Sequence, residues 1–207
     1  MPYKRKYKKK RSYKGAKAMA SLALKMASRN RKAVEVKSTA ASHSGLVSNS
    51  GVVTLISGIA EGTDYDDRIG KKIVIKSVQI KGFMANNDST LGDTTVIRLM
   101  IVRDNSFAGT APAISDLLLN SNAYSLRNPR PDLLRKYTVL YDTFRANDRD
   151  NPSNVFGKYR KLNQQAIFDG ASISSVSKGS LYVVMLSNRS TDIPTVAWQS
   201  MVKFIDE

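Results

Sequence analysis

Hydrophobic and polar residues alternate along much of the chain after residue 51. In residues 71–86, Val78, Ile80 and Met84 fall on one side of an extended backbone and Lys81 falls on the other. A period of two residues is typical of a pleated strand with one face on a core. Similar runs, rich in β-branched and aromatic residues, occupy 52–59, 94–104, 136–146, 158–169, 179–188 and 195–206.

The segments between these runs are rich in turn residues. Gly, Asn, Asp, Ser and Pro fill residues 85–93, 147–154, 169–179 and 188–194. Residues 112–122 differ, because the pattern of PAISDLLLNSN predicts a short helix between two strands. Seven or eight strands joined by such loops favour an antiparallel sandwich, and a jelly roll is the variety that accommodates long loops.

Residues 38–51 are rich in Ser, Gly and Asn, which predicts a linker or loop. The only histidine, His43, lies in this segment. A lone histidine without a partner for acid–base or metal chemistry is assigned no role.

The first 32 residues form a different region, which we expect to be an arm on a domain of residues 33–207. Residues 1–15 contain nothing that could build a core, and they are predicted to be disordered until they meet a partner. Residues 16–30 predict a short helix with Met19, Leu22, Ala23 and Met26 on one stripe. The helix could dock on the domain, or lie with its cationic face on nucleic acid. Membrane-surface binding is disfavoured, because no bulky aromatic residue joins the stripe.

The positive charge is concentrated in this arm. The chain has 207 residues, a net charge of +16 and a pI of about 10.1. Residues 35–207 hold 20 of the 33 basic residues and all 17 acidic residues, so the arm has no carboxylate of its own. Such asymmetry predicts a polyanionic partner. The arm's cations are Lys4, Arg5, Lys6, Lys8, Lys9, Lys10, Arg11, Lys14, Lys17, Lys25, Arg29, Arg31 and Lys32.

Three tyrosines, Tyr3, Tyr7 and Tyr13, are interleaved with these cations. Aromatic rings stack on unpaired bases while cationic groups neutralise phosphates, so the combination predicts binding of single-stranded nucleic acid. The alternative is a tail that only improves solubility. No zinc finger or RNP1-type run is present, and we expect salt-dependent binding that tolerates any sequence.

The sequence contains few of the residues and motifs that enzymes use for catalysis. The chain has no cysteine and one histidine, and it lacks the GxGxxG, GxxxxGK[ST] and HExxH motifs. Hydrolytic triads and zinc–thiolate sites are therefore excluded, and we expect no enzyme. No apolar run reaches the ~18 residues of a membrane span, and the first residues do not have the pattern of a secretory signal.

One loop, residues 61–68, is acidic. It contains Glu61, Asp64, Asp66 and Asp67. Asp64, Asp66 and Asp67 are weak candidates for Ca²⁺ binding, since Ca²⁺ prefers oxygen ligands, but their spacing is not that of an EF-hand. The simpler reading is a solvated loop, or one paired with Arg68 or with a neighbouring subunit.

Several phrases of the sequence, taken together, resemble a known family. They are MPYKRKYKKKRSYK, RIGKKIVIKSVQIKG, VIRLMIVRDN, PAISDLLLN, YSLRNPRPDLLRKYTVLYD and GKYRKLNQQAIFDG. The chain resembles the single jelly-roll capsid proteins of small circular Rep-encoding single-stranded DNA viruses. These proteins are similar to the coat protein of satellite tobacco necrosis virus and, more distantly, to geminivirus coat proteins.

The resemblance implies an eight-stranded antiparallel jelly roll, with residues 33–37 counted as the first strand, and a homo-oligomeric shell of about 60 copies, T=1. It implies an arm directed at a single-stranded genome, with DNA favoured over RNA. Residues 4–11 also resemble a nuclear localisation signal, which implies a host import receptor as partner, a nuclear phase during assembly, and the virion as final location. Alternatives are a nucleic-acid-binding or shuttle protein that forms no shell, and a jelly-roll lectin that uses Trp198, although Trp198 fits core packing better.

Overall fold

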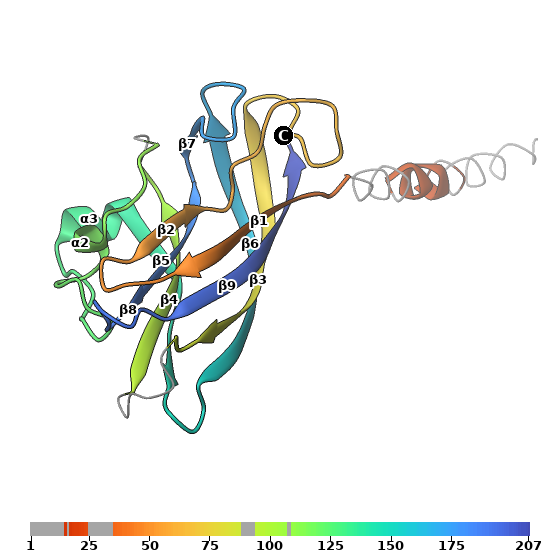
Figure 1. The fold of residues 1–207 in the computed structure, drawn as a ribbon. Helices are drawn as coiled ribbons and strands as arrows, with labels where there is room; N and C mark the ends of the chain where they lie inside the picture. The colour runs from red at the N-terminus through yellow and green to blue at the C-terminus, as the bar shows by residue number, and fades with distance from the viewer. Residues whose placement is uncertain (1–14, 16, 25–34, 88–93, 107–108) are drawn as a thin grey trace, which may run out of the picture. The chain divides into compact units, whose positions relative to one another are not determined.

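A computed structural model describes residues 15, 17–24, 35–87, 94–106 and 109–207. The chain divides into two compact units, Met1–Glu35 and Val36–Glu207, and each is described by itself. The second unit is a β-sandwich of two antiparallel sheets (Figure 1). Its strands are β1 (Lys37–Leu46), β2 (Val52–Leu55), β3 (Lys72–Ala85), β4 (Thr95–Asp104), β5 (Tyr137–Asn147), β6 (Ser153–Phe168), β7 (Val176–Lys178), β8 (Leu181–Ser187) and β9 (Thr195–Asp206).

The strand order makes the sandwich a jelly roll. One sheet, sheet A, has the order β1-β9-β3-β6-β7, and the other, sheet B, has the order β2-β8-β4-β5. Strands that are distant in sequence therefore pair with one another, as in the antiparallel pairs β1–β9 and β2–β8. The predicted all-β jelly-roll sandwich is confirmed, and the short β7 adds a ninth strand at the edge beside β6.

The alternation predicted for 71–86 is present in β3. Val78, Ile80 and Met84 are fully buried, whereas Lys81 is exposed. Between the sheets they meet inward side chains of β4, β8 and β9, such as Leu99. Each strand thus contributes every second residue to one core, and hydrophobic burial holds the two sheets together.

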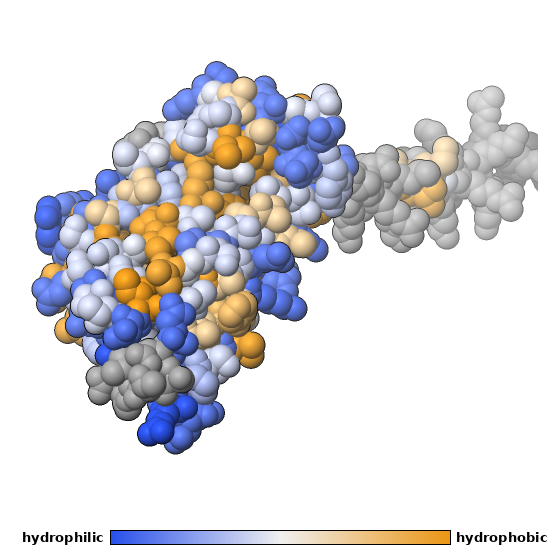
Figure 2. Space-filling model, in the orientation of Figure 1, coloured by the Kyte–Doolittle hydropathy of each residue, from blue (hydrophilic) through white to orange (hydrophobic). Residues whose placement is uncertain are grey.

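The outer face of sheet B is covered by the connection between β4 and β5. This connection contains α2 (Ile114–Leu117), at the place predicted from residues 112–122, and α3 (Pro131–Lys136), which was not predicted. Ile114 and Leu117 of α2 pack on Met100 and Val184 of sheet B. Figure 2 shows that hydrophobic residues come to the surface in the middle of this view, and that hydrophilic residues lie toward its periphery.

The prediction of a linker at residues 38–51 was wrong. Residues 37–46 form β1, which pairs with β9 over its whole length. The first strand starts at Lys37, at the end of the predicted range 33–37, and the described residues 35 and 36 precede it. Small side chains make β1 look like a loop, but an edge strand needs few large residues when its neighbour fills the core. The ladder of backbone hydrogen bonds to β9 then decides the structure.

A row of inward residues explains one glycine in the core. Trp198 of β9, Gly82 of β3 and Phe156 of β6 lie side by side in the sheet. A Cβ atom at Gly82 would lie 2.6 Å from the Trp198 Cβ and 2.7 Å from the Phe156 Cζ. Only glycine lets the two large rings approach the backbone this closely.

Candidate nucleic-acid interface

The N-terminal unit contains a helix among its described residues. Residues 15 and 17–24 have helical backbone; residues 17–24 lie within the predicted helix of 16–30, whereas residue 15 belongs to the segment that was predicted to be disordered. Of the predicted nucleic-acid contacts, only Lys17 is described, and its side chain is exposed. The other predicted cations and the stacking candidates lie outside the described residues: Tyr3, Lys4, Arg5, Lys6, Tyr7, Lys8, Lys9, Lys10, Arg11, Tyr13, Lys14, Lys25, Arg29, Arg31 and Lys32.

The apolar stripe of this helix is partly described. Met19 is 74% exposed and Leu22 is 60% exposed, so within the described residues both are available to a neighbour. In the described part of the chain, no helix is long and apolar enough to cross a membrane.

The start of the jelly-roll unit is held by ionic and polar contacts. The ammonium group of Lys37, at the first residue of β1, lies 3.2 Å from the Asp206 carboxylate and donates a 2.9 Å hydrogen bond to the Asp67 carbonyl. The Tyr65 hydroxyl donates to the Val36 carbonyl at 3.3 Å. The first residues of the unit are therefore fixed to the acidic loop.

That acidic loop is built around a buried arginine. The Arg68 side chain is 0% exposed and lies 4.2 Å above the centre of the Phe168 ring. Its guanidinium donates to the carbonyls of Ile59, Gly70 and Gly170. It also lies 3.3 Å from the Glu61 carboxylate, so the buried charge is paired and satisfied. Glu61 thus serves the fold, in line with pairing to Arg68.

Of the remaining acids of the loop, Asp64 and Asp66 are exposed and Asp67 is half-buried. The Asp67 carboxylate accepts a hydrogen bond from the Asp64 backbone N–H at 3.3 Å. Among the described residues, no group of three His, Asp or Glu side chains is placed to hold a metal ion. Asp64, Asp66 and Asp67 are not brought together as Ca²⁺ ligands would be.

A second ionic cluster fastens the β4–β5 connection to sheet B. The Arg98 guanidinium lies 2.7 Å from the Asp142 carboxylate, and the exposed Arg127 lies 3.1 Å from the same oxygen. Arg98 also donates to the carbonyl of Ser125. Burial disfavours the charge of Asp142, but the hydrogen bonds and charges of Arg98 and Arg127 outweigh it and lower the pKa of Asp142.

His43 and Trp198 are paired in neighbouring strands of sheet A. Their rings stack with centroids 6.2 Å apart across the β1–β9 pair. Trp198 is 3% exposed, which agrees with the expected core packing and removes it as a sugar platform.

A comparison with protein families identifies the chain's relatives. Residues 1–143 match the model described as the Geminivirus coat protein/nuclear export factor BR1 family. The match includes the basic arm and the first five strands as far as the middle of β5. The chain belongs to this family.

The curated relatives of this coat protein family member are named as capsid proteins. Over 132 residues, the chain is 27% identical to the "Capsid protein" of Tomato yellow leaf curl Sardinia virus, and the match covers 59% of the chain and 51% of that protein. The capsid protein of isolate Spain-1 of that virus matches equally well. The chain thus spans about half the length of the curated relatives it matches.

Solved structures give a weaker likeness to this family member. A structure of infectious bursal disease virus, Gx strain, covers 84% of the chain and 41% of its own, with 15% identity and a TM-score of 0.19. At this score the likeness bears on neither assembly nor function.

One surface feature of this coat protein family member could not be found by sequence reasoning. Lys81, Lys161 and Lys203 belong to three different strands. Lys81 and Lys203 are single charges in an alternating pattern, and Lys161 directly follows Arg160. Only the pairing of β6 with β3 and of β3 with β9 brings them onto the same face of sheet A.

Proposed function

We propose that this chain is a viral capsid protein that assembles into a closed shell and packages single-stranded nucleic acid through its N-terminal arm. Membership of a family that contains coat proteins supports the first part. The observation that carries the second part is the separation of charge, with 13 basic residues and no acidic residue in residues 1–34. A polyanion must neutralise these cations, because the arm itself has no carboxylate.

The jelly roll is well suited to a shell and poorly suited to an enzyme. Two of the buried polar clusters among its described residues, around Arg68 and Arg98, are occupied by structural hydrogen bonds. Family membership likewise favours a structural role over an enzymatic one. We propose that about 60 copies form a T=1 icosahedral particle, as the resemblance to small single jelly-roll capsid proteins implies.

Charge balance supports this size. About 60 arms with ~13 positive charges each would supply on the order of 800 charges, a large part of what a genome of one to two thousand nucleotides carries, with small cations covering the rest. We propose single-stranded DNA as the genome, in keeping with the coat protein family. The similarity to the satellite tobacco necrosis virus protein remains a prediction.

The arm is also proposed to act in transport. Seven of the eight residues from Lys4 to Arg11 are basic, the kind of cluster that nuclear import receptors bind. The chain would then pass through the host nucleus during assembly and end in the virion.

A second candidate function is a shuttle protein that binds nucleic acid without forming a shell. The description of the matching family also names a nuclear export factor, and this supports the second candidate. The two functions differ in oligomeric state, since a shuttle protein would stay a monomer or a small oligomer.

Electron microscopy of the purified full-length chain, with sedimentation velocity, tests the proposal. We expect uniform closed particles at low and moderate salt. A chain that remains monomeric in the presence of nucleic acid would contradict the capsid function and favour the shuttle function.

A further inference from the structure

Within the described residues, the outer face of sheet A is exposed, in contrast to that of sheet B. The β4–β5 connection covers sheet B with Ile114, Leu117 and Leu118. On sheet A, the outward side chains of β1, β9, β3 and β6 fall into four rows set by the strand pairing. The rows are Ser38–Lys203–Ser77–Lys161, Ala40–Met201–Gln79–Tyr159, Ser42–Gln199–Lys81–Gly157 and Ser44–Ala197–Phe83–Val155.

These sixteen positions have an unusual composition. They include the three exposed lysines Lys81, Lys161 and Lys203 and no carboxylate. Lys76, just beyond the first row, donates to the Asn163 side chain of β6 at 2.8 Å. The carboxylate of Glu207 lies past these rows, where it accepts a hydrogen bond from Gln165. The charges at these sixteen positions are therefore all positive.

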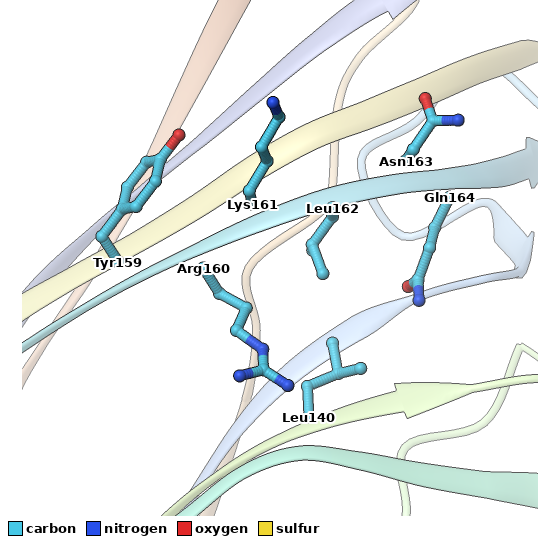
Figure 3. Close-up of a pocket in the computed structure, with 7 residues that line it drawn as sticks. All are labelled: Leu140, Tyr159, Arg160, Lys161, Leu162, Asn163 and Gln164. Carbon is cyan, nitrogen blue, oxygen red and sulfur yellow. The ribbon is translucent and has the colours of Figure 1, made fainter.

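Aromatic side chains lie among these cations. Tyr159 is 59% exposed and Phe83 is 46% exposed. Figure 3 shows Tyr159, Lys161 and Asn163 pointing to one side of β6, and Arg160, Leu162 and Gln164 to the other. A cation-bearing row thus lies next to a row with an exposed ring, about 7 Å away along the strands.

The face is also hollowed. Small side chains of β1 and β9, including Ser42, Ser44 and Ala197, leave two adjoining hollows of about 460 and 560 Å³. Both hollows are bordered by Lys81 and Gln199. A further hollow of about 720 Å³ follows β6, but it is lined by Leu140 of β5 and by side chains on both sides of β6, so it is not confined to this face. Such volumes are large enough for bases or sugars.

We propose that the outer face of sheet A is a second contact surface for single-stranded nucleic acid, separate from the arm. Lys81, Lys161 and Lys203 neutralise phosphates, Tyr159 and Phe83 stack on bases, and the amides of Gln79 and Gln199 hydrogen-bond to base edges or sugars. This inference rests on the proposed packaging function and names a further part of the jelly roll that carries it out.

A second copy of the chain is a poorer occupant for this surface. Two such faces in contact would bring lysines of like charge together, which is unfavourable in an interface. Lysine is depleted from the centres of protein interfaces, and this face has lysine in two of its four rows. Nucleic acid matches both the charge and the exposed rings.

Ultraviolet cross-linking of the full-length chain to oligonucleotides of about 20 residues, followed by mass spectrometry, locates the contact. Oligo-dT and oligo-rU are the two probes. We expect cross-links on the β6 peptide that contains Tyr159 as well as on the arm, and their loss from that peptide in Tyr159→Leu. The probe that cross-links distinguishes DNA from RNA.

Charge variants give an independent measurement. The face variant Lys81→Gln/Lys161→Gln/Lys203→Gln is compared with Arg135→Gln/Arg145→Gln/Arg149→Gln, which removes the same charge at exposed positions of α3, β5 and the loop after it. We expect the face variant to reduce the slope of log Kd against log salt by about 2. The control variant should change it by much less, with unfolding midpoints unaltered in both.

Several results would overturn the inference. Cross-links confined to the arm, with equal slopes in the two variants, would leave the arm as the only contact and the packaging function intact. Normal binding with failed assembly in the face variant would make the surface a subunit interface. A full-length chain that binds neither oligonucleotide would contradict the packaging function itself.

Discussion

The arm and the jelly roll use positive charge in opposite ways. Residues 1–34 contain 13 basic residues and no acidic residue, whereas residues 35–207 contain 20 basic and 17 acidic residues. In the jelly roll, Lys37, Arg68 and Arg98 each lie within 3.3 Å of a carboxylate. These buried charges of the jelly roll thus serve folding, while we propose that the charges of the arm are neutralised by a partner from outside.

The largest effect is expected when the positive charges of the arm are removed. Replacing the seven basic residues of 4–11 by Gln should weaken binding of single-stranded oligonucleotides and reduce the slope of log Kd against log salt by about 5. Fluorescence anisotropy over about 50 to 500 mM salt measures both quantities. Replacing Tyr3, Tyr7 and Tyr13 by Leu is the control that retains charge. It should lower affinity through lost stacking and leave the slope unchanged. An unchanged slope in the Gln variant would remove the arm from nucleic-acid binding.

The next largest effect is expected when the buried ion pair of Arg98 and Asp142 in the jelly roll is broken. Asp142→Asn should destabilise the fold by about 3–5 kcal/mol, because it leaves the Arg98 guanidinium buried without its counter-ion. Urea unfolding of the dissociated subunit measures this loss. Asp132→Asn is the matched control: its carboxylate lies 2.8 Å from Arg130, but both side chains are at least 60% exposed. We expect no shift of the unfolding midpoint there. Equal effects of the two substitutions would contradict the distinction between buried and exposed pairs.

A smaller effect follows from the lowered pKa of Asp142. A carboxyl group whose pKa is lower in the folded state stabilises the fold fully above its unfolded pKa of about 3.9. This stabilisation is lost as the pH falls through the folded pKa. Thermal unfolding is measured at a series of pH values from about pH 7 to pH 2. The midpoint temperature should fall more steeply below pH 4 in the unaltered chain than in Asp142→Asn. Parallel curves would show that Asp142 is not the responsible group.

The smallest effect concerns the acidic loop. A chelator should leave the stability of the particles unchanged, because the described residues of this loop pair with Arg68 and with backbone groups. Light scattering after chelation, with Asp64→Asn/Asp67→Asn as a comparison, measures this. A loss of particles on chelation, reproduced by the double variant, would instead support Ca²⁺ binding at Asp64, Asp66 and Asp67.

The fold was predictable from the sequence where a strand shows regular alternation of hydrophobic and polar residues. Alternation found β3 and β9, because one face of each packs on the core. It missed β1, where Ser and Ala side chains give no hydrophobic signal and pairing with β9 decides the structure. It also missed α3, a helix of six residues.

The candidate site was predictable only in part. The arm is visible in the sequence because its cations are contiguous, from Lys4 to Arg11. The lysines of sheet A come from strands up to 122 positions apart, Lys81 and Lys203, and only their pairing places them together. Charge patterns that depend on long-range pairing are invisible to any local window.

The central claim is that the arm's positive charge packages nucleic acid inside a shell. The most direct measurement is the amount of nuclease-protected nucleic acid in purified particles of the unaltered chain and of the variant with Gln at the seven basic positions of 4–11. We predict protected nucleic acid in the first and little or none in the second. Equal amounts in both would contradict the claim.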